Sequence, residues 1–197
     1  MNFPVFPLNG AILFPNTNLP LNIFENRYID MVDYALSHNR LIGMIQTKKN
    51  KQFFSIGCLG KITSFTETSD GRYQINLEGI NRFRVKKTLD KKHRFIIVDG
   101  EELEYNSNFK KQTSALSSKL LSNFKHYLDI KKIQFNTSEF ESLDALNLAK
   151  IICVISPLDY LTKQMLLEFN SSDDLCENLI SVLEIEINNF GKSLKIN

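Results

Sequence analysis

Residues 65–77 read FTETSDGRYQINL and place a polar turn between two segments of β-forming side chains. Within this turn, Asp70 tolerates a left-handed backbone and Gly71 adopts a positive φ without a Cβ clash. The pair therefore predicts a tight hairpin that joins a strand ending near Thr66 to a strand over 73–77.

Further strands are predicted around this hairpin, because short β-rich runs alternate with turn signals over the first hundred residues. The expected strands cover residues 41–47, 53–66, 72–78, 81–89 and 94–105. Gly57, Gly60 and Gly79 lie within or beside them, and glycine in a strand commonly accompanies a bulge or a sharp bend. We therefore expect a compact barrel rather than an open sheet.

One helix is expected in this half, over residues 25–37. Apolar side chains recur there at intervals of three and four and form one face: Tyr28, Met31, Val32, Ala35 and Leu36. Upstream, prolines divide the chain into short extended pieces, which we expect to line an edge or mouth of the barrel because proline denies a donor to a central ladder. These prolines are Pro4, Pro7, Pro15 and Pro20.

After about Asn106 the spacing becomes helical. Ser138 with Glu141 fits a capping box at the start of one helix, and Ser156-Pro157 is expected to end that helix. Ser171 or Ser172 is expected to cap the last helix. The predicted fold class is α+β, with a β-barrel subdomain carrying one packed helix over 1–106 and a helical bundle over 107–197. No low-complexity linker separates the halves, so we expect them to form one domain.

Composition and charge exclude several classes of function. With 197 residues and 43% hydrophobic content the chain can bury a core, and a net charge of +2 lacks the dense positive field of a non-specific nucleic-acid binder. A local basic stretch from Arg82 to Arg94 begins by alternating with apolar residues, as a strand with one solvated face does. No apolar run reaches membrane-spanning length, and the amino-terminal residues do not resemble a signal peptide. We expect a cytoplasmic protein that does not bind membranes, and the charge alone indicates no nucleic-acid partner.

Catalytic and metal-binding motifs are also not found. Three widely spaced cysteines stand among apolar neighbours, and three isolated histidines form neither an HExxH motif nor a ligand set with a cysteine pair. No GxSxG elbow marks a nucleophile. We predict no metal, no cofactor and no enzymatic activity.

Several segments resemble the Lon substrate-binding domain, most closely that of short bacterial single-domain members. They are FPVFPL (3–8), ILFP (12–15), LPLNIFE (19–25), IGMI (42–45), GCLGKI (57–62), DGRY (70–73), LEGINRF (77–83) and, more weakly, KQMLLE (163–168). The polar and structural positions of this motif are Glu25, Arg27, Tyr28, Arg72, Arg82 and Phe83. Two departures are Asn16, where the family usually has glycine, and Cys176-Glu177, near a usual arginine.

The resemblance implies a PUA-like pseudo-barrel followed by a helical bundle, in a stand-alone domain without the ATPase and Ser-Lys protease modules of full Lon enzymes. It implies a peptide-binding role whose partners are unfolded or extended protein segments, with a separate protease or ATPase as a further partner. An RNA-binding PUA-like module and an adaptor that docks onto such an enzyme remain alternatives.

The entry segment offers a physical route to peptide binding, because its prolines leave backbone groups unpaired beside apolar side chains. The candidate residues are Phe14, Pro15, Leu19, Pro20, Leu21 and Phe24. For any one of these residues, filling the barrel core or the seam between barrel and helices is the more common role, and this alternative stays open at the level of sequence. Arg82 and Glu25 are candidates for an ion pair across the barrel mouth, which would be architectural.

Overall fold

The computed structural model describes residues 1–50, 52–89, 92–105 and 114–193. The chain divides into two compact units, one of Met1–Glu104 with Leu158–Glu168 and one of Tyr105–Pro157 with Phe169–Asn197. We call the first the barrel unit and the second the helical unit. Together their described residues form a six-stranded mixed sheet and five α-helices, an α+β fold as predicted.

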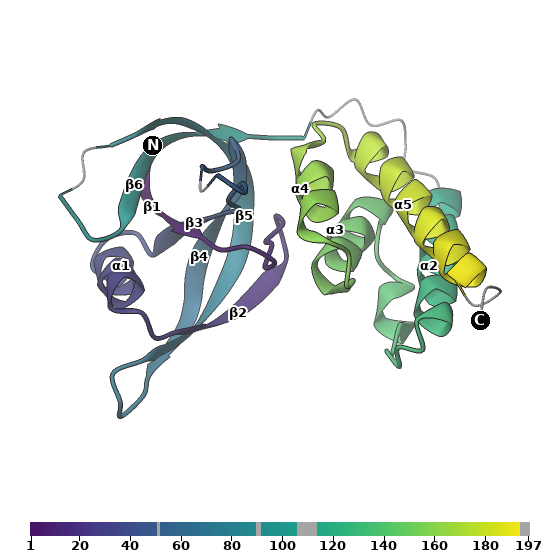
Figure 1. The fold of residues 1–197 in the computed structure, drawn as a ribbon, viewed down its shortest axis with the longest axis horizontal. Helices are drawn as coiled ribbons and strands as arrows, with labels where there is room; N and C mark the ends of the chain where they lie inside the picture. Colours follow the sequence, from purple (N-terminus) through teal and green to yellow (C-terminus); the bar gives the residue numbers. More distant parts are fainter. Residues whose placement is uncertain (51, 90–91, 106–113, 194–197) are drawn as a thin grey trace. The chain divides into compact units, whose positions relative to one another are not determined.

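The sheet of the barrel unit curls round a common interior (Figure 1). Their bounds are β1 Asn2–Pro7, β2 Asn18–Ile23, β3 Leu41–Ile45, β4 Ile56–Glu67, β5 Tyr73–Thr88 and β6 Ile96–Leu103. The order is β2-β5-β4-β3-β1-β6, and β5 also pairs with β6. Five strands therefore close into a ring, while β2 lies outside it and pairs with β5. The β1–β3 pair is parallel and the others are antiparallel.

The hairpin between β4 and β5 confirms the turn prediction. Gly71 has a φ of 77°, and its amide donates to the Thr68 carbonyl oxygen at 2.9 Å. The two strands expected over 72–78 and 81–89 are instead the single strand β5. Leu59 pairs with Asn81 while Gly60 pairs with Gly79, so the predicted irregularity is a bulge that leaves the pairing continuous.

Aromatic rings fill the narrow barrel interior. The core cluster consists of residues at most 2% exposed: Phe3, Val5, Ile45, Leu59, Phe83 and Val98. The rings of Phe3 and Phe83 meet edge to face at 4.9 Å between centroids. A Cβ at Gly43 would lie 2.8 Å from the Phe3 ring and 2.9 Å from the Phe83 ring. Glycine at this position therefore makes room for both rings.

The proline-bearing strands differ in position. Pro20 lies on β2, at the edge, as predicted, but β1 lies between β3 and β6 although it carries Pro4 and Pro7. The expectation of an edge position was therefore wrong for β1. Burying Phe3 and Val5 contributes about 1.5–3 kcal/mol each, which outweighs the about 0.5–1.5 kcal/mol of each ladder bond that a proline cannot donate.

Two helices belong to the barrel unit, α1 Asn26–Leu36 and α4 Tyr160–Glu168. Helix α1 confirms the predicted helix, and its buried face includes Tyr28, Met31, Val32 and Ala35. Helix α4 lies outside the predicted barrel subdomain of 1–106. It joins this unit because Gln164 donates to the Ile56 carbonyl oxygen at 3.0 Å and the Leu167 carbonyl oxygen accepts from Arg82 at 3.1 Å.

The helical unit contains α2 Ser114–Ile130, the 3-10 helix η1 Ser138–Phe140, α3 Ala145–Ile155 and α5 Ser172–Ser193. Helices α2, α3 and α5 contact one another, and their fully buried side chains include Leu120, Phe124, Leu148, Ile152, Leu179 and Leu183. The Ser171 hydroxyl accepts from the Asp173 amide at the start of α5, as predicted.

The capping box predicted at Ser138 was wrong. Ser138 opens only the short η1 turn, and α3 begins after Asp144, whose carboxylate accepts from the Asn147 amide at 2.9 Å. Asp144 has an extended backbone, which sets up this bond, whereas the Thr137 and Ser138 hydroxyls make no such contact at η1.

Candidate functional site

The first half of the entry segment is sealed inside the barrel unit. Phe14 is fully buried and Pro15 is buried too. The turn that follows is closed by Thr17, whose hydroxyl donates to the Phe14 carbonyl oxygen at 2.8 Å, and the Asn16 amide donates to the Gly79 carbonyl oxygen at 2.8 Å. As folded here, Phe14 and Pro15 are not accessible to a peptide. The prediction that they line the binding surface is corrected, because the Phe14 backbone groups are bonded by Thr17 and the following residues Asn16 and Thr17 pair with Gly79 of β5.

The second half of the segment lies at the surface, on and after β2. Leu19 and Leu21 are half-buried, Pro20 is exposed, and Phe24 is 62% exposed. Such exposure is unusual for phenylalanine, which is among the side chains most often buried. Four of the six predicted peptide-binding residues are therefore at least partly accessible.

β2 also presents a backbone edge. Among the described residues it pairs with β5 alone. The Gly79 amide donates to the Thr17 carbonyl oxygen, so the period of two directs the backbone groups of Leu19 and Leu21 toward β5. The same period directs those of Asn18, Pro20 and Asn22 outward. The outward edge offers three carbonyls but lacks the amide donor of Pro20.

A cavity of about 200 Å³ opens beside the end of this strand. We call it the entry groove, and its lining residues are Phe6, Pro7, Leu8, Leu21, Asn22, Ile23, Phe24, Glu25, Arg27 and Tyr28. Its lining includes the rings of Phe6 and Tyr28, whose centroids are 4.3 Å apart. β1, β2 and the first turn of α1 thus meet around one apolar hollow.

The charges at the groove cancel each other. The Arg27 guanidinium pairs with Glu25 at 2.9 Å and stands over the Tyr28 ring at 4.4 Å from its centroid. Burial raises the pKa of Tyr28, the Arg27 charge lowers it, and the Glu25 charge raises it; the net result is a rise. Tyr28 is therefore neutral at physiological pH, and the groove presents an aromatic wall with one balanced ion pair.

The remaining family-motif residues have architectural roles. Arg82 is fully buried and donates to the carbonyl oxygens of Leu167 at 3.1 Å and Glu104 at 3.2 Å. The expected pair of Arg82 with Glu25 is therefore wrong, because Glu25 pairs with Arg27 and Arg82 is enclosed by backbone acceptors. Phe83 belongs to the barrel core, and Arg72 pairs with Asp70 at 2.9 Å in the β4–β5 turn.

The contribution of β1 to this site is not evident from the sequence. Phe6, Pro7 and Leu8 line the entry groove although they stand far from Phe24 in the sequence. Their resemblance to the family motif marked them without assigning them a surface role. Their placement beside β2 and α1 depends on long-range pairing, such as that of β1 with β3, which the sequence does not show.

Neither a metal centre nor a membrane-spanning helix is found in the described part of the chain. No group of three or more His, Cys, Asp or Glu side chains there is arranged to hold a metal ion. None of the helices, over the residues that the structure covers, is long and apolar enough to cross a bilayer. The three cysteines, Cys58, Cys153 and Cys176, are buried, and burial raises the pKa of Cys176 to about 12.

In a comparison with protein families, residues 2–184 match the ATP-dependent protease La (LON) substrate-binding domain. The Lon protease of Buchnera aphidicola subsp. Acyrthosiphon pisum is 25% identical over 201 residues, covering 95% of this chain and 25% of that protein. The Lon protease of Escherichia coli K12 is 25% identical, with the same two coverages. The chain thus spans about a quarter of the length of these curated relatives.

Two solved structures share the fold. The Lon N-terminal domain protein from Xanthomonas campestris has a TM-score of 0.70 at 20% identity and covers 92% of this chain and 98% of its own. The N-terminal domain of the Mycobacterium avium complex Lon protease has a TM-score of 0.77 at 16% identity, with coverages of 93% and 98%.

Proposed function

Because this chain belongs to the family of ATP-dependent protease La (LON) substrate-binding domains, we propose that it is a recognition module that binds extended, apolar segments of client proteins. The proposed binding surface is the entry groove together with the outward edge of β2. The observation that carries the proposal is the highly exposed Phe24 beside an apolar hollow and a strand edge.

A client segment would bind by adding a strand to β2. The outward carbonyls of Asn18, Pro20 and Asn22 accept from the amides of an extended visitor, which gives affinity without regard to its sequence. The missing amide of Pro20 interrupts the ladder, so the added pairing is short and reversible.

Selectivity would come from the groove. Its volume of about 200 Å³ is below the about 300–1,000 Å³ of drug-sized sites, so it accommodates a single side chain. The Phe6 and Tyr28 rings favour an aromatic or aliphatic side chain, and the balanced Glu25–Arg27 pair adds no preference for ligand charge. The expected affinity is micromolar or weaker, with a binding free energy of about 8 kcal/mol at most.

The test is a tiled peptide array probed with the wild-type protein and a Phe24→Asp variant. Phe24 is exposed, so the change leaves the core intact, and we expect loss of binding to apolar peptides. Ile185→Asp is the matched control, since Ile185 is 57% exposed on α5 in the helical unit and should bind as the wild type does. Equal binding by the wild type and the Phe24→Asp variant would refute the groove as the site.

The RNA-binding alternative can be distinguished from this proposal by the salt dependence of the binding affinity. Two cations of the basic stretch face carboxylates, Lys86 at 3.5 Å from Glu101 and Arg94 at 3.9 Å from Asp30, so part of its charge is compensated. Binding through phosphates weakens steeply with salt, whereas binding at an apolar groove changes little. A steep decline of affinity between 50 and 200 mM salt, roughly as phosphate contacts produce, would favour RNA.

The adaptor alternative concerns a partner rather than a peptide. An adaptor would be retained with a separate protease or ATPase in a pulldown whose yield depends on ATP. The Phe24→Asp variant separates the two cases, because loss of peptide binding with unchanged retention would assign docking to another surface.

A further inference from the structure

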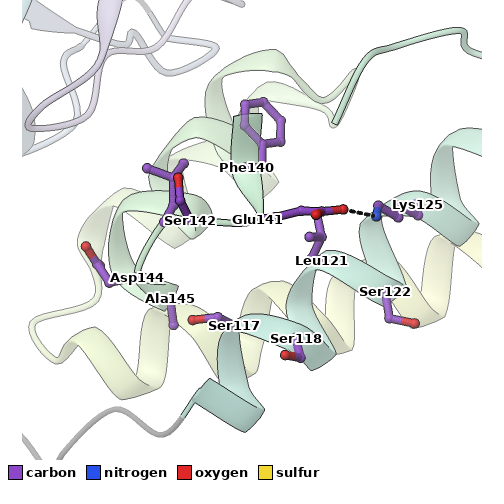
Figure 2. A pocket seen from close by; sticks show the side chains of 11 residues that line it. Ser117, Ser118, Leu121, Ser122, Lys125, Phe140, Glu141, Ser142, Asp144 and Ala145 are labelled. Atoms are coloured by element: carbon purple, nitrogen blue, oxygen red, sulfur yellow. Dashed lines mark hydrogen bonds and ion pairs between the residues drawn. The ribbon is translucent and has the colours of Figure 1, made fainter. Parts of the chain in front are cut away.

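A second, larger cavity lies within the helical unit, between α2 and the segment 140–145 that joins η1 to α3 (Figure 2). Its volume is about 800 Å³, within the about 300–1,000 Å³ typical of small-molecule sites. We call it the serine cavity, and its lining residues are Ser117, Ser118, Leu121, Ser122, Lys125, Phe140, Glu141, Ser142, Leu143, Asp144 and Ala145.

The two walls of this cavity carry opposite charge. The α2 wall provides the Lys125 ammonium and the hydroxyls of Ser118 and Ser122, with no carboxylate among its lining residues. The opposing wall provides the carboxylate of Glu141, whereas the Asp144 carboxylate accepts from the backbone and side-chain amides of Asn147 at the start of α3. A ligand that matches both walls is dipolar, with a negative group toward α2 and a positive group toward segment 140–145.

Figure 2 shows the one ion pair that crosses the cavity, between Lys125 and Glu141 at 3.1 Å. Both side chains are about half exposed, at 45% and 63%, and exposed pairs contribute little to stability. A ligand can therefore replace this contact at low cost, with a carboxylate for Lys125 and an ammonium for Glu141.

The remaining lining is suited to a peptide rather than a lone amino acid. Leu121, Leu143 and Ala145 supply an apolar surface, and hydroxyls on both walls can donate to and accept from amide groups. The cavity also has more volume than a single amino acid fills. Phe140 extends the apolar surface outward, since its ring packs on that of Phe135 at 5.6 Å between centroids.

We propose that the serine cavity binds short peptides through their free termini, with the terminal carboxylate at Lys125 and the terminal ammonium at Glu141. This site differs from the entry groove, which is proposed to take internal segments of longer chains. The proposal stands without the groove, because its residues belong to a different unit.

The test is amide chemical-shift mapping of the full chain with the tripeptide Ala-Leu-Ala, its N-acetylated form and its C-terminal amide. We expect shifts within 117–125 and 140–145, and blocking either terminus should weaken binding about tenfold, as loss of a charged hydrogen bond does. The Lys125→Met variant should bind Ala-Leu-Ala and its C-terminal amide equally well. The Glu141→Gln variant should bind Ala-Leu-Ala and its N-acetylated form equally well. Lys119→Met is the control, since Lys119 lies on α2 outside the cavity lining.

Two results would overturn the proposal. One is equal binding of free and blocked tripeptides, and the other is no shift in the cavity residues at about 10 mM peptide, ten times a millimolar dissociation constant. Shifts confined to residues 21–28 would assign the peptide to the entry groove instead. Free leucine serves as a further arm, and binding as tight as that of the tripeptide would contradict the assignment to peptides.

Discussion

At the scale of single residues, Arg82 is the most constrained charge in the barrel unit. It is fully buried, and its guanidinium donates to the carbonyl oxygens of Leu167 and Glu104. Leu167 lies in the last turn of α4, where the carbonyl groups form the negative end of the helix dipole. Arg82 thus stabilises the end of one helix and the end of β6 with one planar group.

We predict that Arg82→Met lowers the free energy of unfolding by about 2–4 kcal/mol, because the buried carbonyl of Leu167 and the partly buried carbonyl of Glu104 lose a charged donor that methionine cannot replace. The free energy of unfolding of Arg82→Lys should lie between those of the wild type and Arg82→Met, because an ammonium keeps the charge but lacks the planar arrangement of donors. Urea denaturation of the three proteins measures the difference. A methionine variant as stable as the wild type would show that the packing, rather than the guanidinium, holds α4 in place.

At the scale of elements, α3 shows how a helix start depends on one side chain. We predict that Asp144→Ala lowers the free energy of unfolding by about 1 kcal/mol, because the Asn147 amide loses its acceptor. Ser138→Ala should change it by less, since the η1 turn has no side-chain cap at its start. Thermal unfolding of the two variants compares their losses of stability. A larger loss for Ser138→Ala than for Asp144→Ala would support the capping box that the sequence suggested.

A polar contact joins the β4–β5 hairpin to α1. The Tyr73 hydroxyl donates to Asp33 at 2.8 Å, and this bond is the main cause that raises the pKa of Tyr73 from 10.0 to about 12. Because the folded pKa is the higher one, the stabilisation is fully present below about pH 10 and is lost as the pH rises toward 12.

We expect the Tyr73→Phe variant to lack the part of the loss of stability at alkaline pH that comes from ionisation of Tyr73. The free energy of unfolding, measured by urea denaturation at pH 9 and pH 11, should fall less for the variant than for the wild type. Tyr127 is the internal reference, since burial raises its pKa to about 12 as well and it is retained in both proteins. Identical alkaline slopes would mean that the Tyr73–Asp33 contact contributes nothing to stability.

At the scale of the whole molecule, the chain passes between the two units three times, after Glu104, after Pro157 and after Glu168. The barrel unit therefore takes α4 from the second half of the sequence. This helix contacts β4, and Gln164 donates to Ile56 there.

We predict that a polypeptide of residues 1–106 is less stable than the barrel unit in the full chain by at least about 2 kcal/mol, because it lacks the partners of Arg82 and Ile56 on α4. The comparison is made by urea denaturation followed through barrel-unit amide signals. Adding a synthetic peptide of residues 158–168 should restore part of the loss. Equal stability of the short polypeptide would favour the boundary at 106 that the sequence suggested.

The sequence by itself determined the local features. The Asp70-Gly71 turn, the helical spacing of Tyr28, Met31 and Val32, and the Ser156-Pro157 stop each depend on residues that are close neighbours in the chain. Periodicity and backbone preference act over these short distances, so they predict turns, helices and most strands before any tertiary contact forms. The family motif likewise identified the fold.

Only the tertiary structure decided which side chains are accessible. Phe14 and Phe24 are the same residue type in one short segment, yet the first is fully buried and the second is 62% exposed. The difference arises because the turn after Phe14 hydrogen-bonds to Gly79, far along the chain. The partners of Arg82, the place of β1 inside the ring and both cavities depend in the same way on long-range packing, which local patterns do not encode.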